Sequence, residues 1–401
     1  MKNVLIIYVA ALALLLSGCG SETVNSGKFT EINIEEAVFN ETEPCLSEFA
    51  SKIEYIPLET TESSYLGNVS KCAMDPNYIF IASSDFQKTI HVYTHDGKFL
   101  RNIGSKGRGK GEYIAARELK PITDKRALTV TAAGKSITYS AEDGSVLEEF
   151  SFEELLPSAD TSIKPGQRDL FVENGPDGSY YIRETNQRDL SQRIAILDSD
   201  LNHTGQIKIK DAARKKVYSS IPDQTGKIHN LLLPWVYSSI LYNFDGETNV
   251  LTYPIDTISS IDGNKLKPRY TINYGSFKKD VEVINNETLW LTNITELSNM
   301  IILHGTVPDR EKISRIVFNK KNGKSNLVKL SEDLGTSAFV NDLDGGAPFW
   351  PINSDDNRMY MFLDAGKFIE LSEKYNSQKM KEIAAQLTDE SNPVMIAVTL
   401  K

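Results

Sequence analysis

The sequence predicts an all-β chain: a single six-bladed β-propeller of four-stranded antiparallel blades, with one short C-terminal helix. Short runs of β-branched and aromatic residues recur along the chain, separated by turn residues such as Asp-Gly and Asn-Gly. Two such units, with turns at Asp96-Gly97 and Asp143-Gly144, lie 47 residues apart, which is the size of a four-stranded blade. Helical periodicity is nearly absent, and this excludes a parallel α/β fold.

The beginning of the chain has the pattern of a lipoprotein signal peptide. Lys2 precedes an almost wholly apolar run from Val4 to Leu16, which is shorter than a membrane span of about 20 residues. The run ends in Leu16-Ser17-Gly18-Cys19, an aliphatic residue and two small residues before a cysteine. This spacing is typical of a lipobox and predicts lipidation of Cys19.

The same segment sets the expected organisation of the chain. We expect residues 1–18 to be the signal peptide and residues 19–50 to be the lipidated cysteine, a tether and an N-terminal extension. Residues 51–401 form the propeller. No aspartate follows Cys19 directly, which argues against retention in the inner membrane, so we expect an outer-membrane lipoprotein. An acidic run after the cysteine would indicate the cell surface, but only Glu22 is present, so the periplasmic and surface leaflets both stay open.

The charge balance restricts the partners. The whole chain has a formal net charge of −10 at pH 7, and loss of Lys2 with the signal peptide makes it −11. Such an acidic chain without basic blocks argues against nucleic acid as a partner, and leaves the lipid as the expected contact with the membrane.

Two cysteines remain after Cys19. An oxidising compartment permits a disulfide between Cys45 and Cys72. The alternative is two separate thiols, each buried on its own apolar surface.

Strand signals continue to the end of the chain and supply the remaining blades. They include Tyr180–Ile182, Arg193–Leu197, Ser239–Tyr242, Val250–Tyr253, Met300–Leu303, Arg315–Phe318 and Met359–Leu363. One helix is predicted after Ser377, since Met380, Ile383, Ala384 and Leu387 share a face at helical spacing. Val394–Leu400 is expected to be the last strand and to close the ring by pairing in a blade with N-terminal chain.

Several segments resemble the six-bladed β-propeller lipoproteins, which are relatives of the NHL and TolB-like propellers. The segments that carry the resemblance are Ile53–Thr60, Gly97–Leu100, Ile103-Gly104, Gly107–Tyr113, Asn341–Gly346, Pro348–Pro351 and Asn392-Pro393. The family usually has Gly-Pro where this chain has Gly109-Lys110. The resemblance covers the chain from about residue 50 onward. It implies the fold and an envelope location, but no defined activity.

Catalytic and metal-binding patterns are weak. The glycine-rich loop from Gly104 to Gly111 lacks the Lys-Ser/Thr ending of a P-loop, so a connection between blades explains it better. The histidines are dispersed, and no Gly-x-Ser-x-Gly motif is present. We therefore expect no metal, no cofactor and no identifiable catalytic residue.

Two stretches combine polar and aromatic residues in loops between blades, where propellers bind ligands. The first stretch is Arg108–Arg117, and the second is Asp342–Trp350. If the ring is closed, they are expected to be neighbours at one mouth of the central channel. The candidate ligand-binding residues are Arg108, Glu112, Tyr113, Arg117, Asp342, Asp344 and Trp350. The alternative is that both stretches are structural turns, with Tyr113 and Trp350 buried as wedges.

Two classes of function follow from these patterns. The favoured one is a non-catalytic binding or scaffold module that holds a glycan, a peptide or an envelope protein. The other is a hydrolase or lyase that acts on a saccharide in the central channel. The fold itself does not decide between them.

Overall fold

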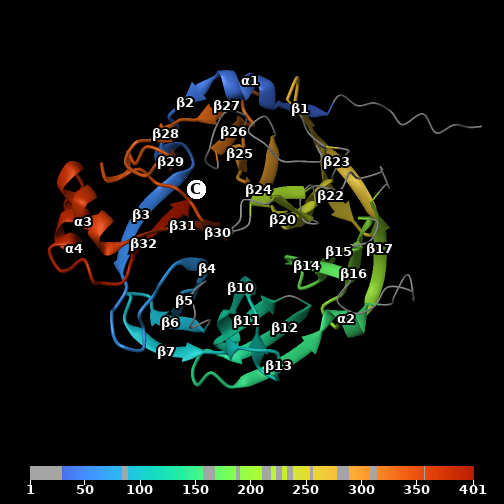
Figure 1. Cartoon of the computed structure of the whole chain (residues 1–401), viewed down its shortest axis with the longest axis horizontal. Coiled ribbons are helices and arrows are strands. Elements are labelled where there is room, and N and C mark those ends of the chain that lie inside the picture. Colours follow the sequence, from blue (N-terminus) through green and yellow to red (C-terminus); the bar gives the residue numbers. More distant parts are fainter. Residues whose placement is uncertain are drawn as a thin grey trace, which may run out of the picture.

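Six small antiparallel sheets surround a common axis in the computed structural model of the chain (Figure 1). The described residues are 29–83, 89–132, 134–156, 168–186, 190–209, 218–222, 228–232, 238–252, 256–277, 289–307, 314–355 and 357–401. The predicted six-bladed propeller is confirmed. The signal peptide and Cys19 lie outside the described residues.

Each blade contains four strands, numbered here from the axis outward. Blade 1 is β4 (Val69–Met74), β5 (Tyr78–Ser83), β6 (Ile90–Thr94) and β7 (Phe99–Ile103); blade 2 is β10 (Ala116–Ile122), β11 (Ala127–Ala132), β12 (Lys135–Ser140) and β13 (Val146–Ser151). Blade 3 is β14 (Arg168–Asn174), β15 (Tyr180–Asn186), β16 (Gln192–Leu197) and β17 (His203–Lys208); blade 4 is β20 (Ile240–Phe244), β21 (Glu247–Thr252), β22 (Thr257–Asp262) and β23 (Lys265–Asn273). Blade 5 is β24 (Trp290–Glu296), β25 (Met300–Thr306), β26 (Ser314–Asn319) and β27 (Ser325–Val328); blade 6 is β30 (Asn353–Ser354), β31 (Arg358–Leu363), β32 (Val394–Leu400) and β3 (Ala50–Pro57).

Three pairs of short strands lie outside these six sheets. They are β8 (Ser105–Lys106) with β9 (Glu112–Tyr113), β18 (Tyr218–Pro222) with β19 (Ile228–Leu232), and β28 (Leu330–Ser331) with β29 (Thr336–Ser337).

The 47-residue repeat corresponds to equivalent turns in blades 1 and 2. Gly97 and Gly144 join the third strand to the outer strand of their blades, with φ of 86° and 76°. At Gly97 a Cβ would lie 2.2 Å from the carbonyl oxygen of Pro57, so glycine is required for space as well as for φ.

The core is divided among the six junctions between blades. Each hydrophobic cluster joins one pair of neighbouring blades, because alternate residues of a strand face opposite sides of its sheet. The cluster between blades 5 and 6 contains 23 buried residues, whereas those on the two sides of blade 3 contain seven each among the described residues. Within the described part of the chain, blade 3 therefore has the smallest apolar clusters on its two sides.

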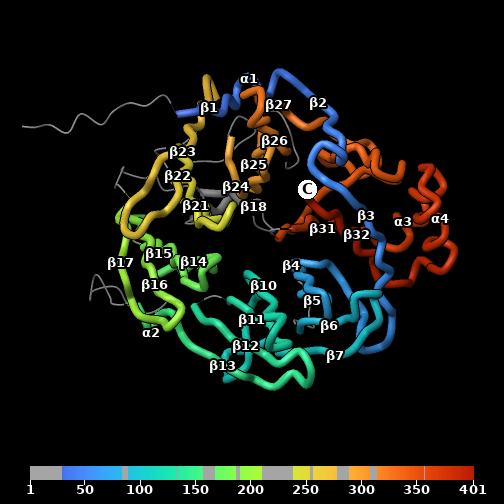
Figure 2. The backbone as a smooth tube through the Cα atoms, turned by 180° about the vertical axis from the view of Figure 1, so that it is seen from behind, coloured from blue at the N-terminus to red at the C-terminus, as the bar shows by residue number. Residues whose placement is uncertain are grey.

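The C-terminal strand closes the ring as expected. β32 lies between β31 and β3, and β3 pairs with it in antiparallel register, with Ile53 opposite Val398 and Tyr55 opposite Ile396. Both views show the blue N-terminal strand beside the red C-terminal strand (Figures 1 and 2).

The chain before β3 is also part of the sheets. We call Thr30–Phe49 the belt: β1 (Thr30–Asn33) pairs in parallel with β23, α1 (Ile34–Phe39) follows, and β2 (Glu41–Thr42) pairs in parallel with β27. The belt, part of the segment expected to be an N-terminal extension, covers outer edges of blades 4 and 5 that would otherwise be open.

The predicted C-terminal helix is present as α4 (Gln378–Ala384), and the Ser377 side chain accepts a hydrogen bond from the Met380 N–H. It is not alone. α3 (Ala365–Lys374) precedes it and buries Phe368 and Leu371, and α2 (Phe152–Leu155) follows β13. The prediction of a single helix is therefore wrong.

The proposed disulfide is absent, since Cys45 and Cys72 are both free thiols. Cys45 lies in the belt, and its backbone pairs with that of Val340 in an isolated parallel β-bridge beside blade 6. Cys72 lies in β4, opposite Ile81, within the core between blades 6 and 1. Each thiol is therefore held by a different part of the ring.

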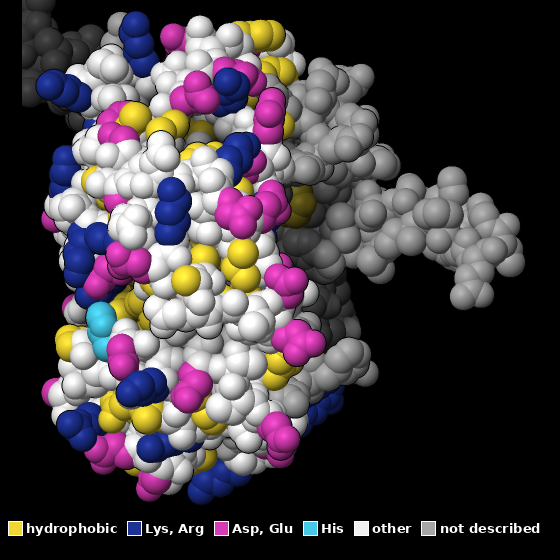
Figure 3. Space-filling model, turned by 90° about the vertical axis from the view of Figure 1, so that its left-hand side faces the viewer, with side chains coloured by type: hydrophobic (Ala, Val, Ile, Leu, Met, Phe, Trp, Pro, Cys, Tyr) yellow, Lys and Arg dark blue, Asp and Glu magenta, His cyan; other side chains and the backbone are white. Residues whose placement is uncertain are grey.

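Charges of both signs alternate over the side of the ring that carries α3 and α4 (Figure 3). No extended patch of one sign is visible on the described part of this face. Within the described residues, no helix is long and apolar enough to cross a membrane.

Candidate functional site

The inner strands define the two ends of the ring. Each blade is an antiparallel meander, and the chain passes from the outer strand of one blade to the inner strand of the next. All inner strands therefore begin at the same end of the axis, which we call the upper end. The first residues of β10 and β14 bring an unusual set of charged side chains to this end.

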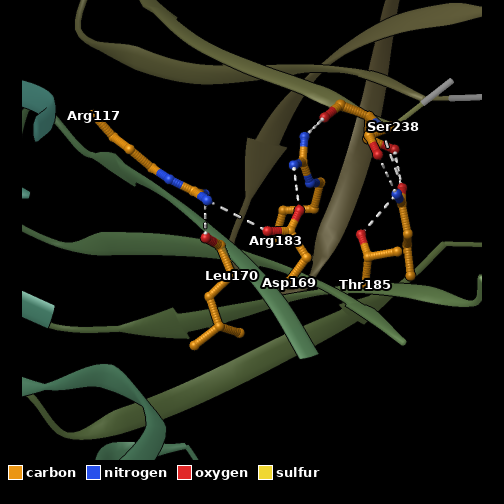
Figure 4. Close-up of polar contacts among 8 residues, drawn as sticks. Arg117, Asp169, Leu170, Arg183, Thr185 and Ser238 are labelled. Atoms are coloured by element: carbon orange, nitrogen blue, oxygen red, sulfur yellow. Dashed lines mark hydrogen bonds and ion pairs between the residues drawn. The ribbon is translucent and has the colours of Figure 1, made fainter. Parts of the chain in front are cut away.

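Arg117, one of the predicted ligand-binding residues, joins blades 2 and 3 at the upper end (Figure 4). Its Nη1 donates to the carbonyl oxygen of Leu170 at 2.6 Å, and its Nη2 lies 3.5 Å from Oδ1 of Asp169. About a third of the side chain is exposed. Arg117 thus reaches from β10 to β14 with a side chain that is only partly buried.

Arg183 makes the corresponding link from blade 3 to blade 4. Its Nη1 donates to the carbonyl oxygen of Ser239 at 2.6 Å, and its Nη2 lies 3.5 Å from Oδ2 of Asp169 (Figure 4). The amide of Gln192 bonds Thr185 and Ser238 next to this contact. The Asp169 carboxylate is therefore shared between two arginines.

Arg168 has the least complete set of partners. Its side chain is 9% exposed, and its Nη1 lies 3.7 Å from Oε2 of Glu184, which is beyond hydrogen-bond distance. That carboxylate accepts bonds of 2.7 and 3.0 Å from Arg193 instead. Nε and Nη1 of Arg168 are buried without a hydrogen-bond partner. An unsatisfied buried donor typically costs about 1–3 kcal/mol.

We call the following set the upper-end cluster: Arg117, Arg168, Asp169, Arg183, Glu184 and Arg193. The set lies beside the two apolar clusters that contain the fewest described residues.

A half-buried carboxyl lies one residue beyond Arg117. Oε2 of Glu118 accepts a 2.5 Å hydrogen bond from the side-chain amide of Asn174 in β14. Burial raises the pKa of Glu118 to about 7, although Lys120 and the bond from Asn174 act in the opposite direction. Glu118 is therefore a carboxyl that exchanges its proton near neutral pH.

The other predicted residues of the first stretch build the loop between blades 1 and 2. Arg108 is exposed. Glu112 folds back over the loop, where its Oε2 accepts from the Gly109 N–H at 2.9 Å. Tyr113 is 2% exposed and packs in the core between blades 1 and 2, where burial raises its pKa. Glu112 and Tyr113 thus have structural roles.

The two aspartates of the second stretch attach the belt and α4 to blade 6. Asp342 accepts bonds from the backbone and the hydroxyl of Ser47 at 2.9 and 2.5 Å. Asp344 accepts from the hydroxyls of Tyr55 and Ser377 at 3.0 and 2.7 Å. Both carboxylates are occupied by contacts within the protein.

Trp350 borders a separate pocket of about 210 Å³. The pocket is lined by Asp333, Leu334, Trp350, Ile352, Met361, Phe362, Leu363 and Lys367. The Arg315 guanidinium lies 4.7 Å from the centre of the Trp350 ring, and burial lowers the pKa of Arg315 to about 9. Trp350 is thus partly buried against blade 5, as the structural alternative expects.

The structure does not bring the two predicted stretches together. Arg117 is bonded to blade 3, whereas Asp342 and Asp344 are bonded to the belt, β3 and α4. In Figures 1 and 2 these elements occupy different sectors of the ring. Of the seven predicted residues, only Arg117 belongs to the upper-end cluster.

Sequence reasoning missed Arg168, Arg183, Glu118 and Glu184. The sequence did contain a signal for these residues. In a strand whose side chains alternate between two faces, they are charged at positions where buried side chains are expected. Among the described residues, no group of three or more His, Cys, Asp or Glu is arranged to hold a metal ion.

The geometry defines a six-bladed β-propeller with an arginine-rich cluster at one end of its axis. The chain belongs to a family described as a domain of unknown function, DUF4934, whose profile matches residues 29–399.

Among the solved structures similar to the chain are two from Bacteroides species. A protein of Bacteroides fragilis that is inferred to be exported is 15% identical, with a TM-score of 0.60 over 93% of this chain and 99% of that one. A member of the DUF4221 family from Bacteroides vulgatus is 11% identical, with a TM-score of 0.40 over 88% of this chain and 97% of that one. No curated protein sequence matches the chain.

Proposed function

We propose that this chain is an exported, lipid-anchored binding module of the outer membrane that holds its ligand at the upper end of the propeller. The lipobox ending in Cys19 supports the anchoring, and the fold is shared with a protein inferred to be exported. The observation that carries the binding role is Arg168, a buried cation whose Nε and Nη1 have no hydrogen-bond partner. A ligand that supplies acceptors there would remove the cost of those unpaired donors.

The anchoring half of the proposal rests on one thiol. The variant Cys19→Ser is expected to move the protein from the membrane fraction to the soluble fraction, because no diacylglycerol can be attached. Fractionation followed by immunoblotting measures the change. Cys45→Ser is the matched control and leaves the protein in the membrane fraction. Incorporation of labelled acyl chains into the Cys19→Ser variant would refute the assignment.

The binding half predicts where a ligand slows amide exchange. The detergent-solubilised full chain is incubated with envelope extract of the producing bacterium, and hydrogen–deuterium exchange is followed by mass spectrometry. Peptides that cover the beginnings of β10 and β14 are expected to exchange more slowly with extract than without it. The turn Thr123–Arg126, at the other end of blade 2, serves as the internal control. Unchanged exchange at both strands would refute a binding role for this end.

A saccharide-acting hydrolase is the second candidate, and Glu118 is the observation that favours it. A carboxyl with a pKa near 7 is suited to act as a general acid at neutral pH. The variant Glu118→Gln separates the two functions. A hydrolase releases reducing ends from envelope saccharide in the unaltered protein but not in the variant. A binding module releases none in either protein and keeps its exchange protection in both.

A further inference from the structure

We infer that the ligand of the upper-end cluster carries an oxyanion, a carboxylate, sulfate or phosphate group, which binds to Arg117 and Arg168. The inference rests on the proposed binding function and names the chemistry of its ligand. The oxyanion is either a free inorganic ion or a group on a larger polymer, and the test below distinguishes these sources.

Both arginines belong to, or are bonded to, the beginning of β14. Arg168 is the first residue of that strand, and Arg117 donates to the carbonyl oxygen of Leu170, two residues further on. Leu170 is also the register partner of Glu184, the carboxylate nearest to Arg168. Arg117 is therefore bonded to blade 3 two residues along the strand from Arg168, at the upper end.

Neither nearby carboxylate is a full counter-charge for these arginines. Asp169 lies 3.5 Å from Arg117 and 3.5 Å from Arg183, so its contact with each is long. Glu184 bonds Arg193 at 2.7 Å and leaves Arg168 at 3.7 Å. Both acids are thus shared. Asp169 is as close to Arg183 as to Arg117, and Glu184 is closer to Arg193 than to Arg168.

The chemistry of arginine selects the class of ligand. A guanidinium has five N–H donors and no acceptor, and it keeps its charge throughout the physiological range. Its planar arrangement of donors matches the paired oxygens of a carboxylate or of a sulfate or phosphate group. Hydrogen bonds to a charged acceptor are also stronger than those to a neutral hydroxyl. An oxyanion therefore satisfies Nε and Nη1 of Arg168 better than a neutral sugar does.

The exposure of the two side chains is compatible with entry of such a group. Arg117 is about one-third exposed, whereas Arg168 is almost fully enclosed. An oxyanion that contacts Arg117 from solvent can extend its remaining oxygens toward the enclosed donors of Arg168. Arg117 then provides the first contact and Arg168 the desolvated one, where the Coulomb attraction is less screened.

Isothermal titration of the detergent-solubilised full chain tests the inference. The probes are sodium sulfate, sodium phosphate and sodium polygalacturonate, each titrated at low ionic strength. The unaltered protein is expected to bind at least one probe, and Arg168→Gln is expected to weaken that binding at least tenfold. Arg126→Gln is the matched control and leaves binding unchanged, because Arg126 pairs with Glu142 on the turn at the other end of blade 2.

A second variant distinguishes loss of binding from loss of folding. Arg117→Gln alters a partly exposed side chain and is expected to weaken binding as well, while a cooperative melting transition above the titration temperature shows that the variant is folded. Binding of sulfate or phosphate alone identifies a free ion, and binding of polygalacturonate alone identifies a group on a polymer. Either outcome upholds the inference.

Two results would overturn it. One is the absence of binding of every probe by the unaltered protein, and the other is equal affinity in Arg168→Gln and the unaltered protein. The proposed binding function is tested separately from the oxyanion, by the exchange protection in envelope extract. If Arg168→Gln keeps the exchange protection by envelope extract, the binding role stands and only the oxyanion is wrong. If the unaltered protein shows no protection, the binding role itself is wrong.

Discussion

Removal of the last strand is expected to abolish folding. A chain ending at Pro393 lacks β32, which lies between β31 and β3 and closes the ring. Five consecutive residues of this strand, Val394–Val398, are at most 1% exposed. Burying each of the four large ones contributes about 1.5–3 kcal/mol, or about 6–12 kcal/mol together. That is comparable with the whole stability of a domain, about 5–15 kcal/mol.

Thermal unfolding followed by circular dichroism measures this effect. The truncated chain is expected to show no cooperative transition, whereas removal of Lys401 alone leaves the melting temperature within a few degrees. Lys401 is exposed, and its side chain donates a hydrogen bond to the carbonyl oxygen of Ser47. A cooperative transition at the original temperature in the chain without Val394–Lys401 would show that the ring does not depend on this closure.

The second large effect is expected at the junction between blades 4 and 5. The side chain of Glu296 is fully buried and lies 2.7 Å from both Arg269 and Lys320. It also accepts a 2.8 Å hydrogen bond from the hydroxyl of Tyr242. Glu296→Gln removes the only charge in this group that is opposite to the two cations. We expect a loss of about 3–5 kcal/mol in the free energy of unfolding, because the cations remain largely buried.

Urea denaturation of Glu296→Gln and Glu142→Gln measures the difference. Glu142 pairs with Arg126 at 2.6 Å, but both side chains are 57% exposed. Exposed pairs contribute about 0–1 kcal/mol, so Glu142→Gln is expected to change the denaturation midpoint little. Equal midpoints for the two variants would contradict the role assigned to Glu296.

The fold was predictable because its signals are local and repeated. The spacing of Asp96-Gly97 and Asp143-Gly144 marks equivalent turns in blades 1 and 2, and the apolar strand Val394–Leu400 is the closing strand. α4 was also predictable, because the cap at Ser377 and the apolar face of the helix are adjacent in sequence. Elements that are specified by neighbouring residues can therefore be predicted from the sequence.

Parts of the fold that depend on distant partners were not predictable. The belt has short, partly polar segments whose strand conformation comes from parallel pairing with β23 and β27. Asp342 looked like a ligand-binding residue, but its carboxylate bonds Ser47, which is 295 positions away. No local pattern reveals such a partner, and an aspartate in a loop has the same appearance in either role.

The candidate site was predicted only in part for the same reason. Arg117 follows a recognisable loop, so its position near the upper end could be expected. Arg168 and Glu184 become significant only when β14, β15 and β16 pair and bring Arg193 to the same carboxylate. The shortage of acceptors around Arg168 is a property of this packing, and the sequence contains no pattern that reports it.

A crystal structure of the full chain soaked with sulfate or with an oligogalacturonate would show whether Arg168 binds an oxyanion. We expect bound oxyanion density within hydrogen-bond distance of Nε or Nη1 of Arg168, with Arg117 in contact with the same group. Density confined to the pocket beside Trp350 or to the other end of the axis, with Arg168 unbound, would contradict it.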